Sequence, residues 1–252
     1  MEAFIKNLAK GAGAILRGGF RTKFKVRYKN GEKWSWVTKY DLLAEKFIIQ
    51  RIRKKYPNHG ILSEESGHII KKDHFWVVDP LDGTVPFSKG AAGFAVSLAF
   101  VRNNKLEYGA VYDPMDDEIF FGKEGHEATL NGQKIQLVQA TSLDFLSVSF
   151  QPGSARSTNK EIKKMFNMLA EHRQWPVNVG SAALALCYVA AGRYDACVST
   201  YLSPWDYAGG ATIIEAAGGK VTDFFGKPYK WNSESLVAAN PVLQKKIIAE
   251  LK

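Results

Sequence analysis

The chain has 252 residues, of which 46% are hydrophobic, and a net charge of +9. A chain of this size and composition can bury a large core, as one unit or as two closely packed halves. Its two cysteines lack zinc or redox spacing, which argues against a disulfide framework and for a reducing compartment. The longest apolar stretch, residues 91–101, is too short to span a bilayer, and early charges argue against a signal peptide. We therefore expect a cytoplasmic protein that makes no membrane contact.

The positive charge is concentrated at the start of the chain. Residues 1–60 contain 15 of the 34 Lys and Arg but only 4 of the 25 Asp and Glu, a net +11. Such an excess can attract a polyanionic substrate or nucleic acid, or it can lie on solvated faces. No basic motif with interleaved aromatic residues accompanies the charge. We favour solvated faces and keep RNA or a transcription complex as the alternative partner.

The first forty residues predict a helix and a β-hairpin. Apolar residues recur at helical spacing over residues 2–17, and two glycines follow them, which indicates an amphipathic helix with a defined end. Apolar and basic residues alternate over residues 24–29. The Asn30-Gly31 pair then marks a turn that leads toward Trp34, so a hairpin is the simplest interpretation.

A second helix is expected from Asp41 to the residues before Pro57. Lys and Arg crowd its C-terminal end, where the helix dipole favours cations. Asp41 has a purely structural explanation here, because an acid in the first turn stabilises a helix.

Strands dominate the next part of the chain. Residues 61–62 and 75–78 read as short buried strands, and the second is expected to end at Asp79. Residues 94–101, 106–112 and 118–121 then predict an antiparallel meander.

The organisation changes near residue 139. Strand-like residues 146–150 precede a helical stretch over 160–172, and a strand over 177–179 leads into a helix at Gly180. Repeated strand-then-helix segments indicate an α/β arrangement. We expect two halves, an α+β half over residues 1–138 and an α/β half over residues 139–252.

Two carboxylates stand at the end of the strand over residues 75–78. Asp79 and Asp82 lie three apart around Pro80, so both side chains leave one tight turn. Their mutual repulsion is costly unless a cation lies between them. Gly83 allows close approach of a ligand, and Thr84 adds a hydroxyl. Oxygen ligands at this density suit Mg²⁺ better than zinc. Taken alone, the same residues could be an inert double turn.

Two further acids, Glu64 and Asp206, have both a structural and a functional interpretation. Glu64 belongs to a Glu-Glu pair, which is usually solvated. Asp206 stands at the start of a helix whose small residues, Ala208 to Ala211, can pack tightly against a neighbour. A helix-start carboxylate would explain Asp206 by itself.

Taken together, these segments resemble the inositol monophosphatase family. The stretch DPLDGTVPF, residues 79–87, closely resembles the signature D-P-[IL]-D-G-T-x-N-F, with Pro86 in place of Asn. The stretch WDYAGGATIIEAAGG, residues 205–219, resembles the second signature W-D-x-A-A-G-x-x-L-x-x-E-A-G-G, with Gly209 in place of Ala. These two signatures are the specific part of the match.

Three weaker elements of the family are also present, so the resemblance covers nearly the whole chain in order. Residues 35–41 are similar to D-x-V-T-x-x-D, with Ser35 at the first acid and Asp41 at the second. Glu64 begins an E-E-S element, and Gly180, Ser181 and Ala182 begin a G-[ST]-A-A element that could equally be a Ser-capped helix.

The resemblance implies a Mg²⁺-dependent, lithium-sensitive phosphomonoesterase. It implies two or three Mg²⁺ held by four carboxylates and one carbonyl: Glu64, Asp79, Asp82, Asp206 and the carbonyl of Leu81. It also implies that Asp41 and Thr84 activate a water for direct in-line attack without a phosphoenzyme. The amides of Gly83 and Thr84 would hold phosphate oxygens. The full set of candidate substrate contacts is Glu64, Leu81, Asp82, Gly83, Thr84, Gly180, Ser181, Ala182, Ser199 and Asp206.

The substrate is less defined than the reaction. Inositol-selective relatives carry a glutamate seven residues before the W-D aspartate, and this chain has Ser199 there. A serine cannot accept the same charged hydrogen bonds, so strict myo-inositol specificity is not expected. A small inositol or sugar phosphate, fructose 1,6-bisphosphate, histidinol phosphate, a 3′-phosphoadenosine nucleotide and NADP remain open.

The resemblance also implies a layered αβαβα sandwich of the sugar phosphatase type and a homodimer.

Overall fold

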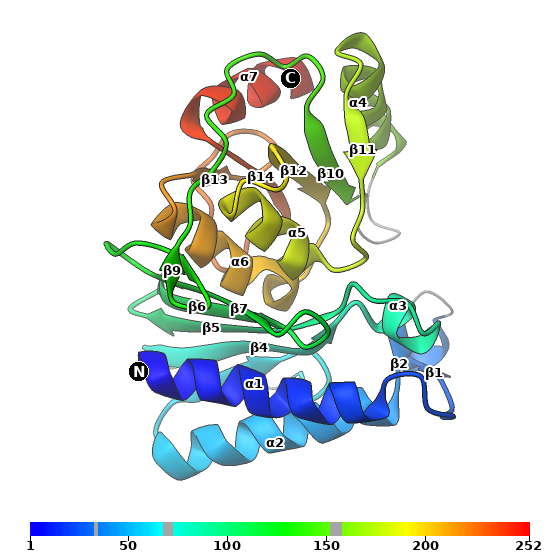
Figure 1. Cartoon of the computed structure of the whole chain (residues 1–252), viewed down its shortest axis with the longest axis vertical. Coiled ribbons are helices and arrows are strands. Elements are labelled where there is room, and N and C mark those ends of the chain that lie inside the picture. Colours follow the sequence, from blue (N-terminus) through cyan, green and yellow to red (C-terminus); the bar gives the residue numbers. More distant parts are fainter. Residues whose placement is uncertain (33–34, 68–72, 152–157) are drawn as a thin grey trace.

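The computed structural model describes residues 1–32, 35–67, 73–151 and 158–252. Its elements form five layers, in the order helices, sheet, helices, sheet, helices (Figure 1). The layered α+β architecture predicted from the sequence is confirmed. The helices of the described residues are α1 (Glu2–Gly19), α2 (Lys39–Lys55), α3 (Thr84–Ser88), α4 (Asn159–Glu171), α5 (Ala182–Ala190), α6 (Pro204–Ala216) and α7 (Pro241–Leu251).

The first layer consists of α1 and α2, packed together on one face of a seven-stranded sheet (Figure 1). The apolar stripe of α1 is buried against this sheet, as its helical spacing predicts. The predicted hairpin is much shorter than its sequence pattern: β1 (Arg27–Tyr28) pairs antiparallel with β2 (Trp36–Val37), and the turn between them includes a single 3₁₀ turn over Lys29–Gly31. The predicted hairpin residue Trp34 lies outside the described residues.

The seven-stranded sheet has the order β3-β4-β5-β6-β7-β8-β9. Only β3 and β4 are parallel, and every other neighbouring pair is antiparallel. The predicted meander therefore forms its centre. The strands are β3 (Gly60–Ser63), β4 (His74–Asp82), β5 (Ala95–Arg102), β6 (Lys105–Asp113), β7 (Glu118–Lys123), β8 (Thr129–Leu130) and β9 (Gln133–Lys134).

The end of β4 was predicted wrongly. The strand expected over residues 75–78 continues as β4 to Asp82, because pairing with β5 resumes at Asp82 after a register shift between Asp79 and Asp82. Pro80 lies inside this irregularity, where its missing N–H breaks no ladder hydrogen bond. The two aspartates thus lie on a bulged strand end and not in a free turn.

The central helical layer, α5 and α6, separates the two sheets. Helix α6 lies against the sheet at unusually short range, because glycines face each other there. A Cβ at Gly109 on β6 would lie 2.4 Å from the carbonyl oxygen of Gly209 on α6. The small residues of the helix therefore do what the sequence predicts, which is to allow close packing.

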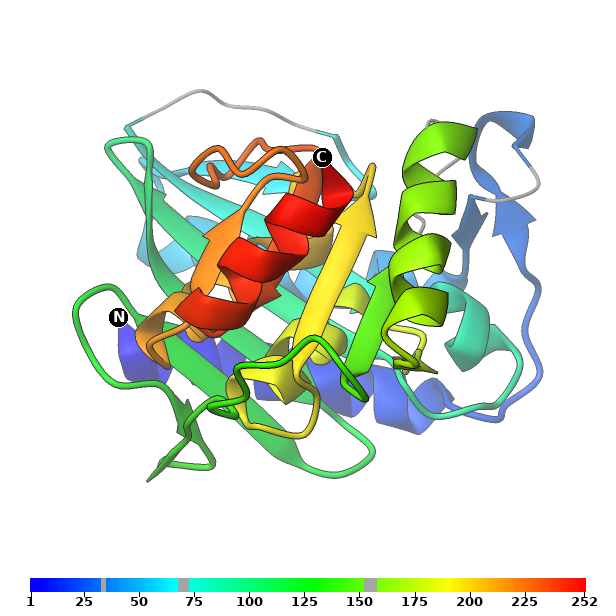
Figure 2. The same cartoon turned by 90° about the horizontal axis from the view of Figure 1, so that it is seen from above.

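The second sheet has five strands in the order β11-β10-β12-β14-β13, with α4 and α7 on its outer face (Figure 2). Strand β10 is parallel to both neighbours, and the other two pairs are antiparallel. The strand predicted over residues 177–179 corresponds to β11, which begins and ends two residues earlier in the chain. The strands are β10 (Ser147–Gln151), β11 (Trp175–Val177), β12 (Ala196–Thr200), β13 (Lys220–Thr222) and β14 (Ser235–Ala239).

Among the described residues, no helix is both long and apolar enough to cross a membrane.

Candidate active site

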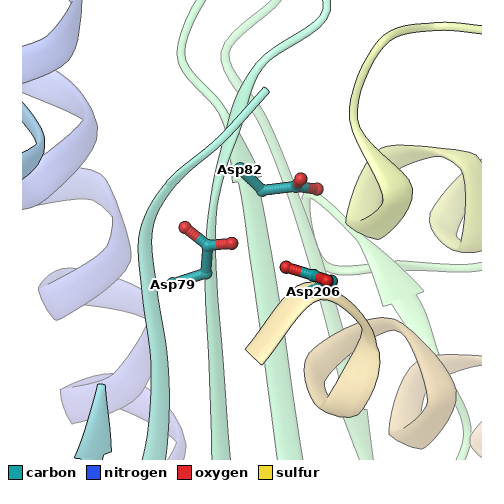
Figure 3. Close-up of side chains that lie close together, drawn as sticks. All are labelled: Asp79, Asp82 and Asp206. Atoms are coloured by element: carbon teal, nitrogen blue, oxygen red, sulfur yellow. The ribbon is translucent and has the colours of Figure 1, made fainter. Parts of the chain in front are cut away.

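Three aspartates from distant parts of the chain meet between the first sheet and α6. One ligand oxygen from each of Asp79, Asp82 and Asp206 can be chosen so that all three lie within 4.8 Å of one another. Figure 3 shows Asp79 and Asp82 leaving the end of β4 and Asp206 facing them from the first turn of α6. The structure thus brings together carboxylates that the sequence separates by more than a hundred residues.

Local backbone features hold these side chains in place. The Leu81 N–H donates to Asp79 Oδ1 at 3.0 Å, and the Ser203 N–H donates to Asp206 Oδ2 at 2.7 Å. Gly83 follows Asp82 with φ of 92°, and a Cβ there would lie 2.7 Å from the Gly93 carbonyl oxygen. Only glycine fits this left-handed, crowded position.

The carboxylates are crowded with like charges. Burial raises the pKa of Asp79 well above its ordinary value, and the charges of Glu64, Asp82 and Asp206 raise it further. Burial also raises the pKa of Asp206, with the Asp82 charge as the next cause. The pKa of Asp82 is raised to about 7 by burial. Divalent cations would remove this repulsion, which is why the donor set fits them.

Asp82 also links the end of β4 to the start of α5. Its Oδ2 accepts a hydrogen bond from the Ser181 hydroxyl at 2.5 Å and from the Ala183 N–H at 2.7 Å. The same hydroxyl accepts from the Leu184 N–H at 3.0 Å and so caps α5. Ser181 is therefore a helix cap, as one interpretation of the sequence held, and it also orients Asp82.

Asp41 and Thr84 form a second polar group beside the carboxylates. The Thr84 hydroxyl donates to Asp41 Oδ1 at 3.0 Å and contacts the Leu81 carbonyl at 3.1 Å. The other oxygen of Asp41 accepts from the backbone N–H and the hydroxyl of Thr38. Burial raises the pKa of Asp41 to about 6, although these hydrogen bonds oppose the shift. The pairing expected from the resemblance is thus present as a hydrogen bond.

Glu64 lies near the aspartates and is paired with Lys29, which no sequence motif indicated. Lys29 Nζ lies 2.7 Å from Glu64 Oε1 and 2.7 Å from Glu65 Oε1. Burial would lower the pKa of Lys29, but the two carboxylates outweigh burial and raise it. Burial raises the pKa of Glu65 to about 8, and the charge of Glu64 adds to this. No local spacing could have indicated Lys29, which comes from the hairpin turn.

Glu45 is another missed residue. It lies buried on α2, one turn after Asp41, and its Oε1 accepts hydrogen bonds from the Ser63 hydroxyl at 2.5 Å and from the backbone N–H groups of Glu65 and Ser66. Glu45 therefore fixes the turn that presents Glu64. Its spacing four residues after Asp41 placed it on the same helical face, which was the available signal.

These groups open into a cleft of about 490 Å³. Its wall includes many of the predicted residues, together with Trp36, Trp205 and Gln151, which were not predicted. The lining residues are Lys29, Ser35, Trp36, Glu64, Asp82, Gly83, Thr84, Val85, Pro86, Gln151, Gly180, Ala182, Leu202, Ser203, Trp205 and Asp206.

Ser199 differs from the other candidate substrate contacts. It is fully buried on β12, and its hydroxyl donates to the Gln151 carbonyl at 3.0 Å. It does not belong to the cleft wall, whereas Gln151 does. A substrate in this cleft would meet Gln151 first.

The site contains the kind of donors that hard cations prefer. The carboxylates of the cluster supply only oxygen, and the Leu81 carbonyl lies beside them with the Thr84 hydroxyl. The residues present therefore fit a divalent cation of the magnesium class.

The chain belongs to the inositol monophosphatase family, whose model matches residues 1–252. The resemblance seen in the sequence is thereby confirmed. The family is generally metal-dependent, in keeping with the acidic cluster.

Particular relatives carry two kinds of name. The chain is 38% identical over 251 residues to the Nus factor SuhB of Escherichia coli, covering 97% of this chain and 92% of that protein. It is 36% identical over 224 residues to the fructose-1,6-bisphosphatase/inositol-1-monophosphatase of Thermotoga maritima, covering 88% and 84%. Among solved structures, it matches the extragenic suppressor protein suhB of Bartonella henselae with a TM-score of 0.92 at 32% identity, covering 100% and 98%.

Proposed function

We propose that this protein is a Mg²⁺-dependent phosphomonoesterase that acts on a small phosphorylated metabolite. The observation that carries the proposal is the meeting of Asp79, Asp82 and Asp206 within 4.8 Å, with Asp79 buried, Asp206 half-buried and all three pKa values raised. So many like charges in one place favour cation binding, and the open cleft beside them can admit a phosphate ester. Family membership supports the same chemistry.

Five groups would hold two or three Mg²⁺: the carboxylates of Glu64, Asp79, Asp82 and Asp206 and the carbonyl of Leu81. Bound Mg²⁺ would polarise the phosphoryl oxygens, make water a better nucleophile and stabilise the leaving oxygen. The ion pair between Lys29 and Glu64 would have to loosen for Glu64 to take part.

The role proposed for Asp41 and Thr84 is to orient and deprotonate the attacking water. The Thr84 hydroxyl donates a hydrogen bond to Asp41, so its lone pairs are available to accept a hydrogen bond from water. Asp41 has a pKa of about 6 and is largely ionised at neutral pH, as a proton acceptor must be. The amides of Gly83 and Thr84 would hold phosphate oxygens. No covalent phosphoenzyme is required.

The substrate proposal is a small sugar or inositol phosphate. The cleft volume of about 490 Å³ leaves room beyond a phosphate, and two aromatic residues, Trp36 and Trp205, are among its lining residues. Because Ser199 is buried and no acid replaces it, the site has less reason to prefer inositol strictly. Fructose 1,6-bisphosphate, histidinol phosphate and a 3′-phosphoadenosine nucleotide are the competing substrates.

A panel of these phosphomonoesters, assayed for phosphate release with Mg²⁺, with EDTA and with added Li⁺, tests the proposal. We expect release that depends on Mg²⁺ and is inhibited by Li⁺. Asp79→Asn should abolish it with an unchanged circular dichroism spectrum, because a lost charge weakens ion binding. Asp116→Asn, at an exposed turn, is the matched control and should keep full activity. Full activity of Asp79→Asn would refute the assignment.

We also propose, from the family, a cytoplasmic homodimer. Light scattering during gel filtration gives the mass directly, and a monomer at micromolar concentration would refute the dimer.

A second candidate function is a role in a transcription complex. Relatives at 38% identity are named Nus factors, and the first sixty residues of this chain are strongly basic. This role could coexist with phosphatase activity, because the acidic cluster lies between the first sheet and α6 rather than on the basic outer helices. Retention on immobilised nucleic acid, measured beside phosphate release, tests it.

A further inference from the structure

Most of the described cations among the first sixty residues form no ion pair with an acid of the described chain. Of the four acids in this segment, Asp41 and Glu45 are buried and hydrogen-bonded inside the molecule. Among the described basic residues, only Lys6, Lys10 and Lys29 form ion pairs within 4.0 Å. The others are Arg17, Arg21, Lys23, Lys25, Arg27, Lys39, Lys46, Arg51, Arg53, Lys54 and Lys55. The outer surface is therefore more basic than the sequence count suggests.

Three of these cations form a line along α2. Lys39, Lys46 and Arg53 are exposed and lie seven residues apart, so they share one face of the helix at intervals of roughly 10 Å. Leu42 and Leu43, 48% and 47% exposed, lie between the first two. We call these five residues the α2 track. In Figure 1, α2 is the outermost helix beside α1, with its outer side away from both sheets.

A hollow lined by three cations and an aromatic ring, with no acid among its lining residues, lies at each end of α2. The first shares Lys39 and Leu42 with the track, and the second lies where the end of α2 meets α1. The hollow at the start of α2 has a volume of about 320 Å³, and that at its end about 510 Å³. The first is lined by Phe24, Lys25, Arg27, Val37, Thr38, Lys39 and Leu42. The second is lined by Phe4, Asn7, Leu8, Arg51, Lys54 and Lys55.

We propose that the α2 track and its two hollows bind single-stranded nucleic acid. Phosphates would follow the cations of the track, and unstacked bases would contact Leu42, Leu43 and the rings of Phe4 and Phe24. This combination of a basic line with aromatic ends is absent from the sequence as a local motif, because Phe4 and Arg51 come from different helices. The inference deepens the second proposed function and is independent of the phosphatase.

Single-stranded nucleic acid fits better than an acidic peptide. An acidic helix bound along α2 would contact only the few cations on one face of that helix. The unpaired cations here extend from the hairpin at one end of the layer to the end of α2 at the other. A flexible polyanion with one charge per residue can follow such a path, and its bases have faces that stack on rings.

Fluorescence anisotropy with a labelled oligouridylate and a labelled oligothymidylate, each of about 20 nucleotides, tests the proposal. The test variant carries Lys39→Gln, Lys46→Gln and Arg53→Gln. The matched control carries Lys160→Gln, Lys163→Gln and Lys245→Gln, exposed lysines of α4 and α7. Lys46→Gln alone serves if the triple variant fails to fold.

The wild-type chain and the control should bind, and affinity should fall steeply between about 50 and 200 mM salt. The track variant should bind at least ~10-fold more weakly, and its slope of log K against log salt should be shallower by roughly 2, since each phosphate contact to a single strand contributes about 0.7. Tighter binding of the uridylate identifies RNA, and tighter binding of the thymidylate identifies DNA.

Absence of binding by the wild-type chain at about 50 mM salt, or equal loss in the control variant, would overturn the proposal. So would equally tight binding of an oligoglutamate, which would point to an acidic protein partner. Phosphate release with Mg²⁺, measured on the same proteins, should be equal in all three. A failure of the phosphatase proposal would appear as no release by the wild-type chain and is thus distinct.

Discussion

Two helix starts in this molecule look alike locally and differ in what they can do. Asp41 of α2 and Asp206 of α6 are each the third helical residue, and each accepts a hydrogen bond from the N-cap N–H, Thr38 at 2.8 Å and Ser203 at 2.7 Å. The remaining oxygen of Asp41 accepts from the neutral hydroxyl of Thr84. That of Asp206 accepts no hydrogen bond from the described residues and lies in the cluster with Asp79 and Asp82.

The comparison shows that a helix-start carboxylate is given its chemical role by its tertiary neighbours. A cap anchors both side chains and sets their direction. Asp41 meets a proton donor and is suited to hold or accept a proton. Asp206 meets other carboxylates and is suited to hold a cation.

Removing the charge of Asp206 should have the largest effect. Asn fits the same space but cannot balance the charge of an ion, and metal ions are expected to supply several kcal/mol to the transition state. We expect Asp206→Asn to lower kcat for phosphate release by roughly 10³-fold, and to abolish the rise in melting temperature that Mg²⁺ gives the wild type. Steady-state kinetics and thermal melts measure both. An unchanged Mg²⁺ stabilisation would mean that Asp206 is only a helix cap.

Asp41→Asn should show the contrasting pattern. Loss of a proton acceptor typically costs about 10²-fold or more in kcat, while Mg²⁺ should still raise the melting temperature because the cluster is intact. Thr84→Ala should likewise lower kcat more than it raises KM. Should Asp41→Asn lose Mg²⁺ stabilisation as fully as Asp206→Asn does, the two aspartates would share one role and the comparison would fail.

The sequence was enough to predict the fold class, because family signatures and alternation patterns agree along the chain. It could not place the end of β4. The dipeptide Asp79-Pro80 is a turn signal, but pairing with β5 resumes at Asp82 and overrides it. Strand pairing in the folded molecule therefore outweighs the local preference for a turn.

Within the site, residues in signatures could be predicted and residues outside them could not. Lys29 lies in a short hairpin turn and reaches Glu64, 35 positions later, only through the fold. Ser199 was expected at the substrate from its spacing to Asp206, but its β12 position turns the hydroxyl to the Gln151 carbonyl. Spacing along the chain does not specify which face of a strand points into a cleft.

The metal-free protein should become less stable as pH rises. The pKa values of Asp41, Asp82 and Glu65 are raised to about 6, 7 and 8. The folded state therefore binds protons more tightly than the unfolded state. The stability that this tighter proton binding contributes is fully present below the ordinary carboxyl pKa near 4. It is lost as pH rises through about 6 to 8.

We expect the melting temperature in EDTA to fall by several degrees between about pH 5 and pH 8, and Mg²⁺ to cancel the fall. Asp206→Asn should reduce the fall, since it removes a charge that raises the pKa of Asp79. Asp116→Asn should leave it unchanged. A melting temperature in EDTA that rises over this range would show that the cluster is not strained by its charges.

The smallest expected effect is the difference in stability loss between alanine variants of the two N-cap residues, Thr38 and Ser203. The Thr38 hydroxyl accepts from the Tyr40 N–H at 3.1 Å and donates to Asp41 at 2.5 Å, and the residue is 2% exposed. Thr38→Ala should therefore cost about 1 to 2 kcal/mol in the free energy of unfolding, a fall of roughly 2 to 8 °C at this chain length. It should also lower kcat, because Asp41 loses one of the groups that hold it. Ser203→Ala should cost less, since Asp206 is held by the backbone N–H, which the substitution keeps. Urea denaturation in EDTA measures both losses, and a larger loss for Ser203→Ala would reverse the assignment of which aspartate is structurally anchored and which is left free for ions.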